Sequence, residues 1–231
     1  MQPTLITENS DYYVINKPAG YSVEPHLNYP SISDWLNTLY DIYAIKDMDR
    51  YGIVHRLDVE TSGVLIWAKN ELAQKDIQKT WQGRAVKKTY LALVTGEVQT
   101  EGGIELAIER DNRNDRQRVV LLPSLKARPA ITNYTRLAVG EWEKEKVSLV
   151  ECHPVTGRTH QIRVHLQSIG HPIIGDRIYG SKLSGKISDS LNLHRQFLHA
   201  WKIELDDTQF IAPPPEDLVR VLQSLKINLP S

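Results

Sequence analysis

The chain has 231 residues, enough for one large domain or two small ones, and its 41% hydrophobic and 24% charged content is that of an ordinary globular protein. Its 28 basic and 28 acidic residues balance, so any surface that attracts nucleic acid must be local. The single Cys152 excludes an intramolecular disulfide and a thiolate zinc site. With no charged leader before an apolar stretch, we expect a cytoplasmic protein without a membrane span.

The first third of the chain predicts two strands and a helix. The run YYVINKP, Tyr12 to Pro18, ends in a Pro-Ala-Gly turn and is typical of a buried strand. Apolar residues at helical spacing then follow Ser31 or Ser33, either of which is a suitable N-cap. The continuous apolar run GVLIWAK, Gly63 to Lys69, predicts a strand that is covered on both faces.

The middle of the chain alternates clear and unclear patterns. Asn70 is placed to cap a second helix that has Gly83 as its C′ residue. The segment KKTYLALVTGEV has strand character as far as Gly96, whereas residues 101–128 look irregular because Gly, Asn and Asp interrupt short apolar pairs. Within them, Glu109 to Arg128 carries six basic residues against three acidic ones, a local surplus of three positive charges.

The last part predicts more strands than helices. AITNYTRLAV and KVSLVECHPV are expected to pair, Thr159 to open a helix that closes at Gly170, and HAWKIEL to form a strand. An amphipathic helix follows the three prolines that end at Pro215. Strands that are close neighbours in sequence favour an α+β fold: a mixed, largely antiparallel central sheet with flanking helices. No linker divides the chain, so we expect one domain over residues 1–231.

The stretch HRLDVETSG, His55 to Gly63, places Asp58 in a turn before a buried strand, where a side chain is both fixed and reachable. An ionised aspartate there can act as a nucleophile or a general base. The structural alternative is that Asp58 caps the turn and pairs with Arg56. A glycosidase pair with Glu60 is a further alternative. A metal site is not expected, because the histidines lack a convergent ligand spacing.

Two other segments offer candidate side chains. GRTHQIRVHLQSIGHPIIGD, Gly157 to Asp176, gathers arginines and histidines around a helix start, where backbone N–H groups favour anions. An arginine here could pair with a carboxylate or hold a phosphate, or the polar residues could form a solvated face. Tyr90, on the predicted strand after two lysines, is either a core residue or a face on which a nucleobase stacks.

Taken together, these motifs resemble the RluA-type pseudouridine synthases, which isomerise uridine in ribosomal or transfer RNA. The resemblance runs in order through NKPAGYSVEP, HRLDVETSG, KKTYLALVTGEV, RPAITNY, GRTHQIRVHLQSIGHPIIGDRIYG and FLHAWKIEL, most of the chain. It implies the pseudouridine synthase catalytic fold without a separate S4-like RNA-binding domain. It also implies Asp58 as the catalytic aspartate, Tyr90 as the tyrosine that stacks on uracil, and Arg163 as the arginine that salt-bridges the aspartate.

The resemblance further implies an enzyme that needs no cofactor or metal and that flips its target nucleotide out of RNA, with Arg56 entering the gap. The expected partner is RNA, either ribosomal or transfer with ribosomal RNA favoured, and the protein is expected to bind it as a monomer. Two alternatives stay open: a non-catalytic RNA-binding or ribosome-assembly module, and a glycosidase or nucleosidase. The expected RNA-binding residues are His55, Arg56, Lys87, Lys88, Arg113, Arg116, Arg118, Arg128, Arg158, His160 and Gln161.

Overall fold

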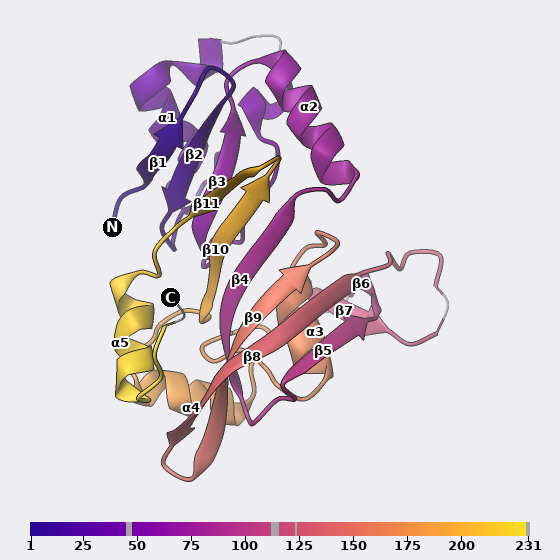
Figure 1. Ribbon diagram of the computed structural model, residues 1–231, viewed down its shortest axis with the longest axis vertical. Coiled ribbons are helices and arrows are strands. Elements are labelled where there is room, and N and C mark those ends of the chain that lie inside the picture. The colour runs from indigo at the N-terminus through magenta and orange to yellow at the C-terminus, as the bar shows by residue number, and fades with distance from the viewer. Residues whose placement is uncertain (45–47, 112–115, 123, 230–231) are drawn as a thin grey trace. The chain divides into compact units, whose positions relative to one another are not determined.

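A computed structural model describes residues 1–44, 48–111, 116–122 and 124–229 (Figure 1). The chain forms two compact units. Unit 1 comprises Met1–Lys88 with His199–Pro214, and unit 2 comprises Thr89–Leu198 with Pro215–Ser231. Strands and helices are mixed in both, and strand pairing is largely antiparallel, which confirms the predicted α+β class. That residues 1–231 act as one catalytic domain stays a prediction.

Unit 1 is built on a sheet in which β3 is a central strand. All seven residues of β3 are buried, as its continuous apolar run predicts for a strand covered on both faces. β3 pairs antiparallel with β2 and parallel with β10. The strand order is β1-β2-β3-β10, with β11 paired to β10. The strands are β1 (Thr4–Glu8), β2 (Tyr12–Lys17), β3 (Ser62–Ala68), β10 (Leu198–Leu205) and β11 (Thr208–Ile211).

The two helices of unit 1 begin at the predicted caps. The Ser31 side chain accepts a hydrogen bond from the backbone N–H of Asp34, and that of Asn70 accepts one from Ala73. α2 packs Ala73 and Ile77 into a core that includes Val64 of β3. The helices are α1 (Ile32–Tyr40) and α2 (Glu71–Gln82), with short 3-10 turns η1 (Ile42–Ala44) and η2 (Asp49–Gly52).

Unit 2 contains a four-stranded antiparallel sheet and a separate hairpin. The sheet order is β4-β9-β8-β5, and β8 and β9 form the long pair that the sequence predicts. The strands are β4 (Lys87–Thr95), β5 (Glu101–Glu105), β6 (Ala107–Asp111), β7 (Arg116–Val120), β8 (Ile131–Trp142) and β9 (Glu145–Pro154); the helices are α3 (Gln161–Ser168), α4 (Lys182–Ser190) and α5 (Glu216–Ser224).

Three local expectations need correction. Residues 101–128 contain β5, β6 and β7, because cross-strand pairs stabilise strands that have no clear apolar alternation. α3 begins at Gln161 instead of Thr159, since His160 takes a left-handed conformation with φ 55°. Gly83 is the right-handed C-cap of α2, and Arg84 adopts the positive φ expected of the C′ residue. Among the described residues, no helix is long and apolar enough to cross a membrane.

Candidate active site

The turn that carries Asp58 is fixed by an earlier segment of the chain. The carbonyl of Asp58 accepts a hydrogen bond from the N–H of Thr61 at 3.0 Å. The next carbonyl, that of Val59, accepts both the N–H of Gly20 at 2.9 Å and the ammonium of Lys17 at 3.1 Å. Lys17 is fully buried. The NKPAG motif therefore holds the backbone directly after Asp58, whose own side chain is half-buried.

The residues after this turn explain the TSG motif. Gly63 has φ 125°, and a Cβ on it would lie 2.1 Å from the carbonyl oxygen of Ala200, so only glycine fits beside β10. The Ser62 hydroxyl lies 2.9 Å from Nδ1 of the buried His199, and Nε2 of that ring lies 2.9 Å from the carbonyl of Ala212. Because a carbonyl only accepts, Nε2 carries the proton and Nδ1 accepts from Ser62. His199 thus anchors the start of β3.

His55 makes a structural contact in unit 1. Its Nε2 accepts the backbone N–H of Ile66 at 2.9 Å, and its ring stacks on Trp81 with centroids 4.2 Å apart. Burial, and then the charge of Lys88, lower the pKa of His55 to about 3. The imidazole is therefore neutral and supports the strand beside the Asp58 turn, and its predicted contact with RNA stays a prediction.

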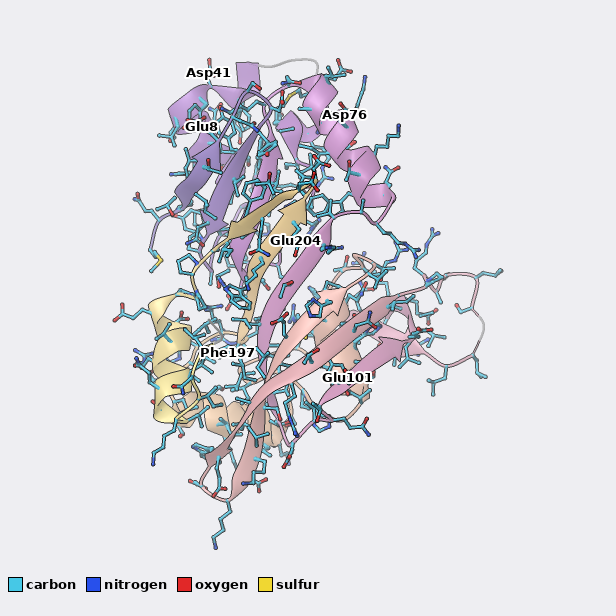
Figure 2. All side chains as sticks on the ribbon, in the orientation of Figure 1. Glu8, Asp41, Asp76, Glu101, Phe197 and Glu204 are labelled. Carbon is cyan, nitrogen blue, oxygen red and sulfur yellow. The ribbon has the colours of Figure 1, made fainter. Side chains whose placement is uncertain are left out.

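The neighbouring cations differ in how they are held. Arg56 is exposed and makes no hydrogen bond or ion pair within the described residues. The alternative in which Arg56 pairs with Asp58 is therefore not observed there. Lys87 is exposed and pairs with Glu204 at 2.8 Å. Glu204 lies on β10 (Figure 2). Lys88 is half-buried, and burial lowers its pKa to about 8.

Tyr90 lies on β4 in unit 2, directly opposite Cys152 of β9. It is half-buried and packs against the apolar core of that unit. The prediction that Tyr90 is a core residue is therefore confirmed for the buried part of its side chain. Its role as a stacking surface for a base stays a prediction.

Arg163 forms a buried bidentate ion pair with Asp176, a partner that the sequence analysis did not name. Its Nε donates to Oδ2 of Asp176 at 2.7 Å and its Nη2 to Oδ1 at 2.9 Å, and the arginine is only 5% exposed. Asp176 Oδ1 also accepts the N–H groups of Ile178 and Tyr179, each at 2.9 Å. Burial alone would raise the pKa of Asp176, but these bonds and the guanidinium charge hold that pKa below its usual range.

The loop before α3 is held by Gln161, which is buried. Its side-chain N–H groups donate to the Ile131 carbonyl and the Thr132 hydroxyl, each at 2.9 Å. Its Oε1 accepts from the Thr156 hydroxyl and from the Arg158 N–H. These bonds tie the loop to β8 and leave the Arg158 side chain exposed. An RNA contact by Gln161 stays a prediction.

The hairpin arginines are partly neutralised. Arg118 donates to Glu109 through Nε at 3.0 Å and through Nη2, and Nε of Arg116 lies 4.0 Å from Asp111. Arg128 is exposed and makes no side-chain ion pair within the described part of the chain. The positive charge that this segment can offer to RNA is therefore smaller than its composition suggests.

The predicted residues are divided between the units. Asp58 belongs to unit 1, and Tyr90 and Arg163 belong to unit 2, so their meeting stays a prediction. Arg113 lies outside the described residues. Sequence reasoning missed Asp176, although it stands inside the quoted motif, because its partner lies thirteen positions earlier. Within the described ranges, no three His, Cys, Asp or Glu side chains gather as metal ligands do.

Comparison with known proteins agrees with the motifs. A model described as RNA pseudouridylate synthase matches residues 11–168. The ribosomal large subunit pseudouridine synthase D of Nitrosomonas europaea is 38% identical across 98% of this chain and 66% of its own. The protein of the same name from Xylella fastidiosa is 37% identical across 96% and 69%. The structure of human RNA pseudouridylate synthase domain containing 4 is 26% identical, covers 98% of this chain and 94% of its own, and has a TM-score of 0.80.

The chain belongs to the RNA pseudouridylate synthase family, which confirms the resemblance of its motifs. It spans about two thirds of the length of the two curated bacterial relatives. The structural likeness to the human protein extends over nearly the whole of both chains.

Proposed function

We propose that this chain converts uridine in structured RNA to pseudouridine, with Asp58 as the catalytic carboxylate. The observation that carries the proposal is the family match over residues 11–168, which contains Asp58, Tyr90 and Arg163. The rigid support of the Asp58 turn by Lys17 and Gly20 agrees with a carboxylate that must be held in one place.

The reaction is an isomerisation, so the atomic composition of the uridine is unchanged. The bond between N1 of uracil and C1′ of ribose breaks, the detached uracil rotates, and C5 bonds to C1′. The proton on C5 leaves and N1 gains a proton. No oxidant, reductant or co-reactant enters this balance. The protein must therefore supply a carboxylate, a surface that holds the free base, and a site that excludes water.

Asp58 has a role under each scheme for this chemistry, acting at C1′ or C2′ of the ribose or at C6 of the base. In the proposal, Arg163 pairs with Asp58 and keeps it charged and oriented when water leaves, because an unpaired buried charge costs several kcal/mol. Tyr90 provides a face for the mobile base, worth ~1 to 3 kcal/mol in a typical stack. The bidentate bond to Asp176 fixes the plane of the Arg163 guanidinium.

The target uridine must leave the RNA stack, which costs a few kcal/mol and selects loops and flexible regions. Arg56, exposed and without a protein partner among the described residues, is placed in the proposal to enter the gap. Phosphate contacts from Arg128 and Arg158, both exposed, offset part of the cost. Lys88, Arg116 and the other predicted basic residues add to this surface.

Ribosomal RNA is the substrate we propose, because the relatives from Nitrosomonas europaea and Xylella fastidiosa are named for the large ribosomal subunit. Transfer RNA is the alternative. We further propose that the protein acts as a monomer in the cytoplasm.

The test is to map pseudouridines by carbodiimide labelling in total RNA from cells with and without the gene, and then with the Asp58→Ala variant restored. We expect one or more sites to disappear in the deletion and to stay absent with Asp58→Ala. Sites restored by Asp58→Ala would overturn the role of Asp58. Release of free uracil from RNA by the purified protein would identify a nucleosidase instead. Rescue of a growth defect by Asp58→Ala, with no site affected, would identify a non-catalytic module.

A further inference from the structure

We propose that Tyr179 is a positioning residue with two effects: it orients the guanidinium of Arg163, and it fixes the position of the β6–β7 hairpin on α3. The inference rests on the proposed function, because it concerns the arginine assigned to that reaction. Tyr179 is 5% exposed and contacts three separate segments of unit 2: α3, the loop before α3, and β7.

The first step is the turn that fixes Tyr179 itself. Asp176 Oδ1 accepts the N–H of Tyr179 at 2.9 Å, and its backbone carbonyl accepts the N–H of Gly180 at 2.9 Å. A Cβ at Gly180 would lie 2.2 Å from that carbonyl, so the turn admits only glycine there. The carboxylate that pairs with Arg163 therefore also determines where the tyrosine stands.

The second step is the ring of Tyr179. Its centroid lies 5.1 Å from Cζ of Arg163, within the range of a cation–π contact. The guanidinium is thus held at its edge by Asp176, and it lies over the ring of Tyr179. Because an arginine plane must be oriented to address a second carboxylate, both contacts restrict which way its remaining N–H groups can point.

The third step is the hydroxyl of Tyr179. It accepts the backbone N–H of Gln117 at 2.8 Å and lies 3.0 Å from Nδ1 of His160. Gln117 is the donor in the first bond, and the direction of the second depends on the tautomer of His160. One oxygen therefore joins Gln117 of β7 to the loop before α3.

The fourth step is the small apolar core under the hairpin. Ile108 of β6, Val164 of α3 and the Tyr179 ring are buried together, with Val119 of β7 packed against them. β7 and α3 are neighbours in unit 2 (Figure 1). The hairpin that carries Arg116 and Arg118 therefore packs on α3 through Tyr179, the residue that also contacts Arg163.

The two parts of the side chain predict different kinetic effects. Removing the hydroxyl in Tyr179→Phe leaves the Gln117 N–H without its acceptor and loosens the hairpin, so KM for RNA should rise by about five- to tenfold with kcat nearly unchanged. Removing the ring in Tyr179→Leu also frees the face of Arg163, so kcat should fall by about tenfold or more.

The experiment measures kcat and KM for pseudouridine formation, together with the urea midpoint, for wild type, Tyr179→Phe, Tyr179→Leu and a control. The control is Trp142→Leu, which removes an aromatic ring and a hydrogen bond to Ser190 elsewhere in unit 2. We expect Trp142→Leu to lower the midpoint without changing kcat. A kcat near that of wild type in Tyr179→Phe, together with a lowered kcat in Tyr179→Leu, would support the proposal.

The opposing outcomes are distinct. If wild type forms pseudouridine and Tyr179→Leu keeps the wild-type kcat, the inference on Tyr179 is wrong while the proposed function stands. The inference on Tyr179 is also wrong if Trp142→Leu and Tyr179→Leu have equal urea midpoints and lose the same fraction of kcat. The loss would then follow from reduced stability alone. If wild type forms no pseudouridine in any RNA, the proposed function and this inference fail together.

Discussion

Arg163 and Asp176 form a bidentate ion pair inside unit 2, and the aspartate side chain has no exposed surface. Removing one charge of a buried ion pair has a typical cost of about 3 to 5 kcal/mol. We therefore expect Asp176→Asn to lower the free energy of unfolding by about this amount and to reduce activity at least tenfold. Urea denaturation and a pseudouridine assay measure the two effects.

The chain contains a matched control for this prediction. Arg195 donates to Asp217 in the same bidentate manner, at 2.6 and 3.1 Å, but the Asp217 side chain is 37% exposed. Asp217→Asn should lower the free energy of unfolding by less, because the Asp217 carboxylate is already partly solvated in the pair, and it should leave kcat unchanged. Equal effects of Asp176→Asn and Asp217→Asn on kcat would contradict a special role for the Arg163 pair.

His55 predicts a dependence of stability on pH. Its pKa is lowered to about 3 in the fold, whereas an unfolded histidine titrates near 6.5. The unfolded chain therefore binds an extra proton between these values, and the free energy of unfolding should fall as pH decreases from about 6.5 toward 3. His55→Gln keeps an acceptor for the Ile66 N–H but cannot titrate. The free energy of unfolding should therefore depend less steeply on pH, by up to the contribution of one proton. An unchanged slope in urea titrations at pH 4 to 7 would contradict the assignment.

Lys88 predicts a dependence of RNA affinity on pH. Burial lowers its pKa to about 8, so its positive charge is lost as pH rises through that value. If Lys88 contacts phosphate, RNA affinity should fall between pH 7 and pH 9 in wild type. The RNA affinity of Lys88→Arg should stay constant over that range, because arginine keeps its charge. Filter binding at constant salt compares the two, and identical profiles would remove Lys88 from the RNA surface.

Exposed arginines without an ion pair are expected to contribute more to RNA binding than paired ones. Arg128 is exposed without a side-chain ion pair in the described ranges, whereas Arg136 is tied to Glu97 and to the Val98 carbonyl. Arg128→Gln should weaken RNA binding and lower the slope of log affinity against log salt by about one. Arg136→Gln serves as the control and should leave the slope unchanged. The reverse ranking would contradict the proposed surface.

The elements with strong local patterns could be predicted from the sequence. β3 follows from one continuous apolar run, α1 and α2 from helical spacing behind Ser31 and Asn70, and the β8–β9 pair from two adjacent strand patterns. These signals lie within a few residues of one another, so they can be seen without knowledge of tertiary contacts.

The missed elements depend on distant contacts or weak propensity. β6 and β7 are stabilised by a cross-strand pair of Glu109 with Arg118 and by docking on α3. α4 has a glycine and several serines, and its capping box uses Ser184 where glutamate or glutamine is the usual signal. Neither feature produces an amphipathic pattern that is visible in a short window.

The candidate site was predicted residue by residue but without its support. Asp58, Tyr90 and Arg163 stand in motifs, so the resemblance could assign them roles. Lys17 and Asp176 are identified as supporting residues only when the chain is folded, because their hydrogen bonds cross long sequence separations or follow a turn that local patterns do not specify.

The central claim is that Asp58 is the catalytic carboxylate of pseudouridine formation in RNA, a reaction that releases the C5 proton of uridine. The most direct measurement is release of tritium to water from RNA labelled at C5 of uridine, by the wild-type chain and by Asp58→Asn, with fold and RNA affinity checked for both. We predict release by wild type in proportion to pseudouridine formed, and none above background by Asp58→Asn. Release by Asp58→Asn at the wild-type rate would contradict the account.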